Sequence, residues 1–378
     1  MLPRIARLIA TTTALAAMAG LSFAQSLPRQ VETENYTLSI ETVADGLSSP
    51  WGATFLPDGA MLITERTGTL QRVDMTSGEM SVIEGTPEVF ARGQGGLLDV
   101  ELHPNFTENR LVYLTFAQPR DEGAATAAGR GRLSDDGSRL EDFEVIFQQQ
   151  PAVSGSNHFG SRLAFSPDGK LFITLADRFN HMNEAQNPRN HLGVVVRLND
   201  DGSVPEDNPF ASGGEGAPEV WSYGHRNVQG AAIHPETGAL WISEFGPRGG
   251  DEVNIPEAGG NYGWPLVSAG NHYSGRSIPD PSTKPELKSA VQSWNPAISP
   301  SGIAFVPEGP LGEWKGDLLL AGLSSQAITR LDLQGQEVLG DERIEMAARI
   351  RDVIFDEKGT LYALTDGEGG ALIRLMPR

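Results

Sequence analysis

One short pattern recurs along the chain and limits the possible folds more than any other feature. An apolar segment leads into a turn built on proline with an acid or glycine, and a second apolar segment follows, as in residues 55–64 and 165–174. Such turns between apolar, alternating segments predict paired strands. The copies begin at Phe55, Leu102, Phe165, Ile233, Phe305 and Phe355. Six copies of a multi-strand unit predict an all-β propeller, whose blades bury their faces only against neighbouring blades.

Neighbouring copies begin about 47 to 72 residues apart, which exceeds the ~40–50 residues of a minimal blade. The surplus predicts long rim loops, the longest after Ala117, from Asp177 to Val194 and from Ser243 to Trp294. No linker or change in composition divides the chain, and no convincing amphipathic helix is visible in the sequence. We therefore expect one propeller domain in residues 25–378, with the folded domain beginning at about Val31.

The first 24 residues are typical of a secretory signal peptide. Arg4 and Arg7 precede an apolar, alanine-rich stretch, and Ser22-Phe23-Ala24 fits a small-x-small cleavage site. The stretch is too short and too rich in alanine for a membrane span. This predicts a secreted protein, with the periplasm as its location if the source is a Gram-negative bacterium, and no membrane span in the mature chain.

Composition excludes several kinds of chemistry. The chain of 378 residues has no cysteine, so disulfides, thiolate metal sites and a cysteine nucleophile are excluded. Its formal net charge is −20 and no basic patch is evident, which argues against a nucleic-acid partner. The acidic residues could recruit calcium through carboxylate oxygens, although a solvated surface explains most of them.

A histidine stands where the chain enters the third repeat. His158 lies in the segment 156–163, and a strand end after a glycine-containing loop is a common place for reacting side chains, because the sheet holds them rigidly. A lone loop histidine can also be a hydrogen-bonded structural residue. The segment on its own leaves both interpretations open.

Other loops carry polar groups suited to an anionic ligand. Gln94 lies in a glycine-rich segment before the second repeat, and Arg226 with Asn227 precedes the fourth. Arg349 and Arg351 precede the sixth and point the same way if they lie on a strand. Two neighbouring cations would suit a polycarboxylate. The alternatives are a tight turn at Gln94, an inter-blade salt bridge for Arg226 and an exposed strand face for the arginine pair.

Residues 244–254 combine carboxylates and exposed carbonyls in a glycine-rich loop, which is a moderate signal for calcium because this cation prefers flexible oxygen ligands. The spacing does not match an EF-hand. Residues 261–265 and Tyr273 add aromatic side chains that could pack against a planar ligand or fill a blade.

These motifs resemble those of the soluble pyrroloquinoline quinone (PQQ)-dependent sugar dehydrogenases, in particular the periplasmic aldose sugar dehydrogenase branch of the soluble glucose dehydrogenase family. The resemblance runs from residue 47 to residue 366. Its most specific segments are residues 93–98, 158–163, 224–227, 246–252, 261–265 and 349–352. It implies a six-bladed propeller with four antiparallel strands per blade, in agreement with the six repeats.

The resemblance also implies roles for the loop residues. His158 would be the general base that takes the proton of an aldose's anomeric hydroxyl, Asp177 would orient it, and Arg226 would steady developing negative charge. Hydride would pass from the first carbon of the sugar to PQQ. The residues implied to contact the cofactor are Gln94, Arg226, Asn227, Tyr273, Arg349 and Arg351.

Two calcium ions are implied as well. The backbone oxygens of Gly246 and Pro247, together with the cofactor, would hold one ion that polarises the reacting carbonyl. Glu252 and the carbonyl of Tyr262 would hold a second, structural ion. The substrate would be an aldose; the sequence identifies neither the preferred sugar nor the electron acceptor, and it leaves open a monomer or a homodimer.

Two positions depart from the family pattern. Asn157 stands where an acid commonly precedes the histidine, and Ser324 stands where a lysine commonly faces PQQ. Losing that cation would weaken cofactor binding by about 1.5–3 kcal/mol. Two alternatives therefore stay open: a propeller that has lost PQQ and binds or scaffolds other molecules, and a calcium-dependent lactonase.

Overall fold

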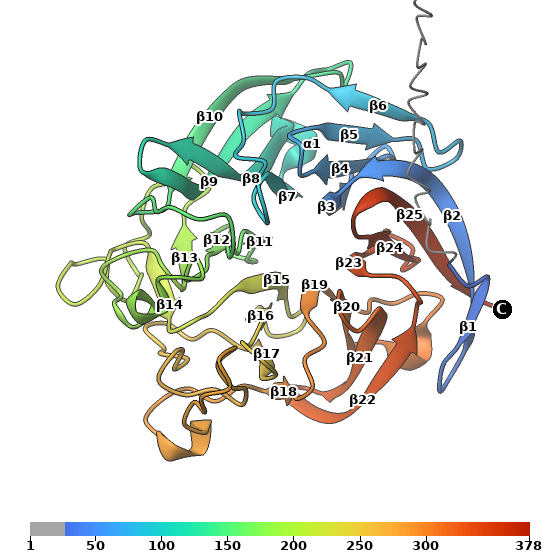
Figure 1. The fold of residues 1–378 in the computed structure, drawn as a ribbon. Helices are drawn as coiled ribbons and strands as arrows, with labels where there is room; N and C mark the ends of the chain where they lie inside the picture. The colour runs from blue at the N-terminus through green and yellow to red at the C-terminus, as the bar shows by residue number, and fades with distance from the viewer. Residues whose placement is uncertain (1–26) are drawn as a thin grey trace, which may run out of the picture.

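Six antiparallel β-sheets surround a central axis in the computed structural model, which describes residues 27–378 (Figure 1). Five sheets have four strands and the sixth has five. The predicted six-bladed, all-β propeller is confirmed. The predicted signal peptide lies outside the described residues.

The first three blades follow one another along the chain, from the axis outward. Blade one contains β3 (Pro50–Phe55), β4 (Met61–Glu65), β5 (Leu70–Val73) and β6 (Met80–Ile83). Blade two contains β7 (Leu97–Leu102), β8 (Leu111–Arg120), β9 (Gly123–Leu133) and β10 (Leu140–Gln148). Blade three contains β11 (Leu163–Phe165), β12 (Leu171–Thr174), β13 (Val194–Leu198) and β14 (Val220–Tyr223).

The remaining blades complete the ring. Blade four contains β15 (Val228–Ile233), β16 (Leu240–Glu244), β17 (Asp251–Asn254) and β18 (Gln292–Trp294). Blade five contains β19 (Pro300–Phe305), β20 (Leu318–Gly322), β21 (Ala327–Gln334) and β22 (Glu337–Glu345). Blade six contains β23 (Ile350–Phe355), β24 (Leu361–Thr365), β25 (Glu368–Pro377), β2 (Thr37–Ser48) and β1 (Gln30–Glu32). The helical segments of residues 27–378 are single turns: α1 (Phe106–Asn109), η1 (Met182–Gln186), η2 (Pro281–Thr283) and η3 (Gly312–Trp314).

Each sequence repeat forms the two innermost strands of a blade. In the first, Phe55 pairs with Met61 across the turn, and the Asp58 side chain accepts the Ala60 N–H at 3.0 Å. Gly59 has φ +85°, a conformation that glycine adopts without steric cost. The turns predicted from the sequence are therefore the turns of the inner hairpins.

The ring closes with a strand from the beginning of the described chain. β2 pairs with β25, so residues from both ends of the chain complete blade six, and β1 extends this sheet to five strands. The sequence repeats did not predict this closure, because the pairing joins segments more than 300 residues apart, such as Leu38 and Pro377.

One predicted rim loop is wrong. The chain does not leave the sheet after Ala117 but continues along β8 and returns along β9. The strand pattern was hidden because β9 is rich in alanine and glycine. A Cβ at Gly129 would lie 2.5 Å from the ring of Phe143, so glycine makes room for that ring. The other two predicted insertions do contain long loops, around η1 and between β17 and β18.

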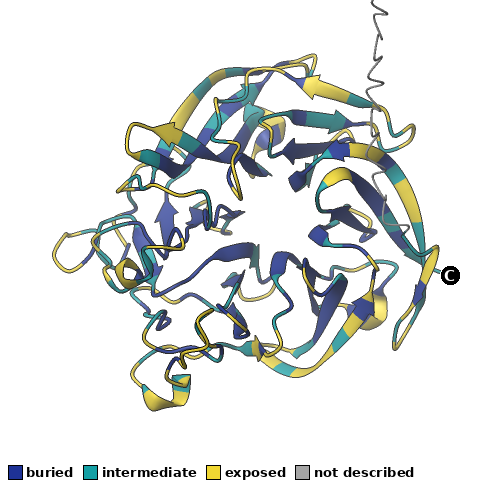
Figure 2. Cartoon of the chain, in the orientation of Figure 1, coloured by how far each residue is buried: buried dark blue, intermediate teal, exposed yellow. Residues whose placement is uncertain are grey.

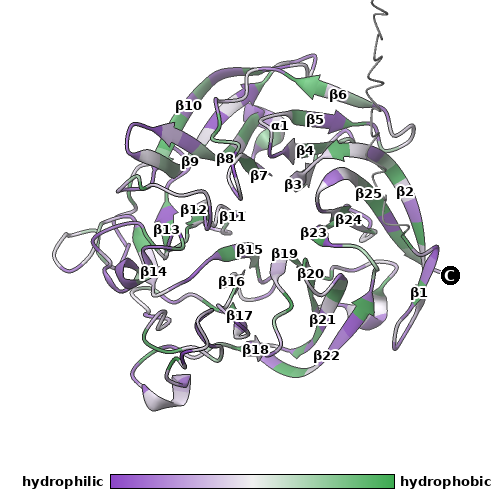
Figure 3. Ribbon diagram, in the orientation of Figure 1, coloured by the Kyte–Doolittle hydropathy of each residue, from purple (hydrophilic) through white to green (hydrophobic). Residues whose placement is uncertain are grey.

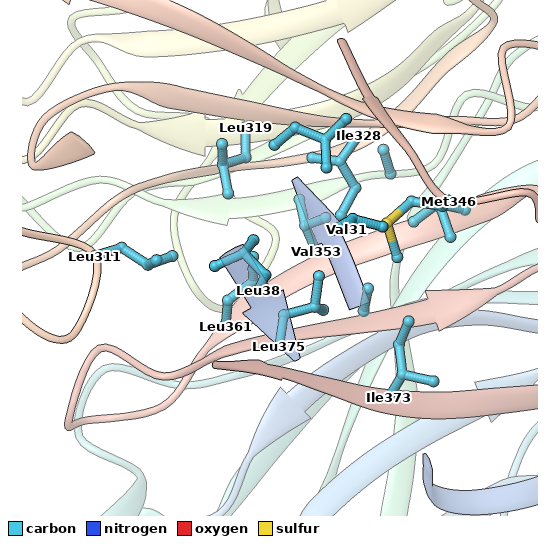
Figure 4. Close-up of a cluster of buried hydrophobic side chains, with 14 of the residues drawn as sticks. Val31, Leu38, Leu311, Leu319, Ile328, Met346, Val353, Leu361, Ile373 and Leu375 are labelled. Carbon is cyan, nitrogen blue, oxygen red and sulfur yellow. The ribbon is translucent and has the colours of Figure 1, made fainter. Parts of the chain in front are cut away.

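The core is a ring of six apolar layers, one between each pair of neighbouring blades. Figure 2 shows buried residues lining the inner strands and exposed residues on outer strands and loops, and Figure 3 shows hydrophobic residues mainly on strands. Figure 4 shows the layer between blades five and six, where Leu319 and Ile328 lie near Val353, Leu361 and Leu375, with Leu38 of β2 among them. No helix in residues 27–378 is long and apolar enough to cross a membrane.

The antiparallel order explains how distant loops meet. In each blade the connection entering the first strand and the one leaving the second strand emerge at the same end of the sheet. Repeated in six blades, this places twelve connections on one rim, named here the upper rim. The loops predicted to carry polar ligands belong to these two kinds of connection, except the segment with Tyr262 and Tyr273, which lies between β17 and β18.

Candidate active site

The upper rim holds a buried histidine–aspartate pair. His158 precedes β11, and its Nδ1 lies 2.7 Å from Oδ1 of Asp177, which follows β12. The other oxygen of Asp177 accepts the indole N–H of Trp264 at 2.8 Å. Because a carboxylate only accepts hydrogen bonds, this pairing places the proton of neutral His158 on Nδ1 and leaves Nε2 as the basic atom. An orienting role for Asp177 stays a prediction, and this hydrogen bond is the contact that such a role requires.

The backbone around His158 is strained and strongly supported. His158 has φ +54°, which is unfavourable for a residue with a Cβ. Its N–H donates to the side-chain oxygen of Gln94 at 2.7 Å. The buried guanidinium of Arg178 holds the same loop by donating to the carbonyls of Asn157 (3.1 Å) and Gly155 (2.8 Å). Strain retained by so many contacts is typical of a functional site.

Arg226 links the histidine pair to the glycine-rich loop after β16. The Asp177 N–H donates to the Arg226 carbonyl at 2.9 Å. The guanidinium of Arg226 donates to the Gly246 carbonyl at 2.6 Å and to the Tyr273 hydroxyl at 3.3 Å. One buried cation thus contacts the predicted metal-binding loop and the predicted aromatic residue.

A pocket of ≈ 210 Å³ opens beside this network and near the propeller axis; we call it the axial pocket. Gln94, Arg349 and Arg351 line it, as predicted for an anionic ligand. Asp366 pairs with both arginines at 2.7–2.8 Å. Although burial raises the pKa of Asp366, these arginines lower it below its usual value. The other lining residues are Trp51, Arg66, Gln229, Phe245 and Leu323, so three arginines against one aspartate leave the pocket positively charged.

Beneath the axial pocket, Arg162 forms a buried charged hub. Its guanidinium lies 2.9 Å from both Asp99 of β7 and Asp352 of β23. The three side chains are only 6–7% exposed. Burial raises the pKa of Asp352 to about 6, although the charge of Arg162 opposes this shift.

The same guanidinium supports the floor of the axial pocket. Its Nε donates to the Gln229 carbonyl at 2.8 Å, and Nη2 lies 3.4 Å from the carbonyls of Trp51 and Arg351. All three of these residues line the pocket. Arg162 therefore sets the backbone position of residues from blades one, four and six.

Two glycines make space for this hub. A Cβ at Gly302 would lie 1.6 Å from Oδ1 of Asp352, and a Cβ at Gly52 would lie 2.4 Å from Oδ1 of Asp99. Gly52 lies on β3 and Gly302 on β19. The inner region of every blade therefore contributes to the hub, either with a polar group that contacts it or with a glycine that leaves room for it. Arg162 could not be recognised as a site residue from the sequence, because its partners are far away in the chain.

The predicted calcium ligands lie close together. Gly246, Glu252 and Tyr262 line a cavity of ≈ 20 Å³, together with Glu244, which is room for about one water-sized particle. Burial, and then the nearby charge of Glu244, raises the pKa of Glu252 to about 8. Two close carboxylates with little solvent favour a cation. Pro247 is buried beside Gly246.

No three His, Asp or Glu side chains are grouped as metal ligands within residues 27–378. A cation here would therefore need backbone oxygens, such as that of Gly246, in addition to carboxylates. A carbonyl has two lone pairs, so the bond from Arg226 leaves one available.

Several buried polar atoms around the upper rim have no partner. Among the described residues, these include Nε of Arg66, Nε of Arg226 and Nδ2 of Asn227. Unpaired buried donors are costly, and each such group calls for a ligand or another explanation. Three unsatisfied N–H donors beside a positively charged pocket fit an oxygen-rich anionic ligand.

The structure brings most predicted residues together but not all into one pocket. His158, Asp177, Arg226 and Tyr273 form one connected group, while Gln94, Arg349 and Arg351 line the axial pocket. Tyr273 is 61% exposed at the mouth. Ser324 follows pocket-lining Leu323 and bonds to Ser299 through their hydroxyls at 2.7 Å. The specific roles of these residues stay predictions.

No role was predicted from the sequence for Arg66, Asp366 or Arg162, and Trp264 was predicted only as one of the aromatic residues of segment 261–265. Arg66 directly follows the hairpin of the first repeat, and Asp366 directly follows the hairpin of the sixth. Their positions at the ends of repeats could therefore have indicated that both residues lie on the upper rim. Larger hollows of ≈ 300, ≈ 400 and ≈ 660 Å³ contain none of the predicted site residues. The one of ≈ 400 Å³ lies on the other side of the hub.

Comparison with known proteins identifies the family of the chain. The family described as "Glucose / Sorbosone dehydrogenase" matches residues 47–374. The aldose sugar dehydrogenase YliI of Escherichia coli (strain K12) is 42% identical over 350 residues, covering 90% of this chain and 94% of that protein. Quinoprotein glucose dehydrogenase B of Acinetobacter calcoaceticus is 30% identical over 441 residues, covering 94% and 90% respectively.

A solved structure shows the same architecture. The PQQ-bound aldose sugar dehydrogenase of Streptomyces coelicolor superposes with a TM-score of 0.74 at 28% identity. The match covers 93% of this chain and 100% of that one. The similarity therefore spans the whole ring of blades and not a single repeat.

Proposed function

The chain belongs to the Glucose / Sorbosone dehydrogenase family, and from this premise we propose that it oxidises an aldose at the anomeric carbon to the lactone, with PQQ and calcium as cofactors. The observation that carries the proposal is the His158–Asp177 pair beside a positively charged axial pocket, to which the bond from the His158 N–H to pocket-lining Gln94 connects it. We propose the periplasm as its location, on the basis of the signal peptide predicted in residues 1–24.

The residues present fit this cofactor. PQQ carries carboxylates and quinone oxygens, and the axial pocket presents Arg66, Arg349 and Arg351 with the amide of Gln94. The unpaired N–H donors of Arg226 and Asn227 lie on the adjacent loop. Gly246 and Pro247 would supply carbonyl oxygens to calcium, and Glu252 with Tyr262 would hold a second ion. When bound, calcium-assisted PQQ would supply the acceptor for the sugar's hydride.

The chain's own residues perform the proton chemistry. Nε2 of His158 takes the proton of the anomeric hydroxyl while the C1–H hydrogen leaves as hydride, so the carbon–oxygen bond becomes the lactone carbonyl. Asp177 keeps the Nδ1 proton in place and stabilises the imidazolium that forms. The positive charge of Arg226 stabilises negative charge that develops near Gly246.

A reconstitution experiment tests the proposed function. The purified protein is titrated with PQQ in the presence of calcium by calorimetry, and dye reduction is then followed with a panel of aldoses. We expect saturable cofactor binding and dye reduction that is lost when calcium is chelated. Methyl β-D-glucopyranoside, which has no anomeric hydroxyl, is the control substrate and should give no reaction.

The two alternatives predict different results in this experiment. Absence of both cofactor binding and dye reduction would leave a binding propeller, or a lactonase if the protein hydrolyses lactones with calcium alone. A lactonase needs several carboxylate and amide ligands around one metal. The described residues provide no such group of three acidic or histidine side chains, which gives that alternative no support.

The pH dependence of the reaction should report the state of His158. Burial lowers its pKa below the usual value of about 6.5; nearby Arg226 and Arg178 lower it further, and Asp177 opposes the shift. The base acts when neutral, so kcat/KM should be constant at neutral pH and fall only below about 6.5. Asp177→Asn removes a charge that favours the imidazolium and should move the midpoint to lower pH. A midpoint above the ordinary histidine value, or one unmoved in Asp177→Asn, would contradict the assignment.

A further inference from the structure

An exposed phenylalanine stands beside the reacting histidine and has no role in the chemistry described so far. Phe179 follows Asp177 by two residues and is 40% exposed. Its ring centre lies 5.0 Å from that of His158, with the planes at 85°, and 6.1 Å from that of Tyr273. Phe179 and Tyr273 thus form an aromatic surface at the mouth of the site, open to solvent. We call these two residues the aromatic platform.

The backbone holds Phe179 in an unfavourable conformation. Phe179 has φ +66° and Arg178 before it has φ +54°, so two consecutive residues with bulky side chains occupy the left-handed region. The Phe179 N–H donates to Oδ1 of Asp177 at 2.7 Å, the same oxygen that pairs with His158. Arg178 is anchored beneath, with its guanidinium 3.8 Å from the ring centre of Phe159. The fold therefore holds two consecutive residues in an unfavourable backbone conformation, and this places an exposed apolar ring at a fixed distance from the base.

Such an arrangement calls for a ligand with an apolar face. Exposure of a phenylalanine ring to water does not stabilise the fold, and glycine or asparagine would adopt this backbone conformation with less strain. The ring forms of aldoses carry hydroxyls around their edge and C–H groups on their faces, so a face packs on an aromatic ring while the edge reaches polar groups. Polar groups are present on the same side: Arg226 donates to the Tyr273 hydroxyl, and the His158 ring adjoins Phe179.

We propose that Phe179, with Tyr273, binds the C–H-bearing face of an aldopyranose and thereby presents its anomeric hydroxyl to Nε2 of His158. This inference rests on the proposed function and names its substrate as a sugar in the pyranose form. Phe179 acts as a specificity and positioning residue and takes no part in proton or hydride transfer. The contact is made by the ring of Phe179, so any residue without a flat apolar face should bind the sugar poorly.

The test separates sugar binding from stability. Phe179→Gly removes the ring and relieves the positive φ, whereas Phe179→Tyr keeps the ring. In the PQQ- and calcium-loaded protein we expect Phe179→Gly to raise KM for D-glucose about tenfold with a much smaller change in kcat, and Phe179→Tyr to stay near wild type. The melting temperature of Phe179→Gly should equal or exceed that of wild type, because strain is removed. Cofactor affinity should be unchanged in both variants.

A matched control is Val82→Ala, which truncates another exposed apolar side chain, on the outermost strand of blade one (β6) and outside the set of residues that line the axial pocket. It should leave KM unchanged. If Phe179→Gly binds glucose as well as wild type does, or if it lowers the melting temperature by several degrees while KM stays the same, Phe179 is a packing residue and the proposal is overturned.

Sugar contact is also measured without turnover, by saturation-transfer NMR with methyl β-D-glucopyranoside. An active wild type with unaltered sugar contact in Phe179→Gly overturns the platform and leaves the proposed function intact. An inactive wild type whose sugar contact is lost in Phe179→Gly supports the platform while the proposed function fails. A wild type with neither activity nor sugar contact overturns both.

Discussion

His158→Ala should lower kcat for aldose oxidation by about 10²–10⁴-fold, the usual contribution of a general base. The alanine variant keeps the backbone N–H that donates to Gln94 but removes the imidazole held by Asp177. Since His158 lies outside the set of residues that line the axial pocket, PQQ affinity measured by calorimetry should stay within a few-fold of wild type. A drop in kcat without a loss of cofactor is the signature of a group that acts on the substrate.

Two controls make this result specific. His158→Asn also lacks the base, but asparagine tolerates φ +54°, so it should be equally inactive with less backbone strain. His234 is another buried histidine, which packs against Trp241 at the opposite end of blade four. His234→Asn should retain kcat. Turnover of His158→Ala within about threefold of wild type would remove the base assignment.

Arg162→Met should give the largest loss of stability and also weaken PQQ binding at least tenfold. The substitution leaves Asp99 and Asp352 buried without their cation, and breaking such a pair costs about 3–5 kcal/mol of unfolding free energy. It also releases the carbonyls of Gln229, Trp51 and Arg351 at the floor of the pocket. Urea unfolding gives the first quantity, and calorimetric titration under conditions where the variant is folded gives the second.

Arg330→Met is the matched control for this experiment. Arg330 is equally buried and bridges Asp317 and Glu342 at 2.8–2.9 Å, but it lies on β21 and contacts no residue of the axial pocket. We expect a comparable loss of stability and unchanged PQQ affinity. Equal PQQ affinities in the two variants would show that Arg162 only stabilises the fold. Arg162→Lys keeps the charge but not the fork of donors, so its PQQ affinity should lie between wild type and Arg162→Met.

Local chemistry explains why much of this protein could be predicted from its sequence. The conformation of a Pro-Asp-Gly turn and of the alternating residues around it depends on neighbours a few positions away. The inner hairpin of each blade could therefore be recognised in the sequence, and the number of hairpins gave the number of blades. Polar groups such as Gln94, His158 and Arg226 stood at the entrances of these hairpins, where antiparallel order brings them to one rim. The β9 strand was not predicted because glycine is unusual in a strand, and the reason for it lies outside the local sequence. The glycines make room for the ring of Phe143, which packs against them from the next strand.

By itself, then, the sequence determined the inner strand pair of each blade, the number of blades and the residues available on one rim. Only the tertiary structure decided which of these residues meet, that β2 closes the ring, that Arg162 joins Asp352 across 190 positions of the chain, and that Phe179 is held beside His158. The physical reason is the distance along the chain over which each interaction acts. Turn and strand preferences act within a few residues, whereas the position of a charge or ring in the site depends on the summed packing of six apolar layers that no local pattern encodes.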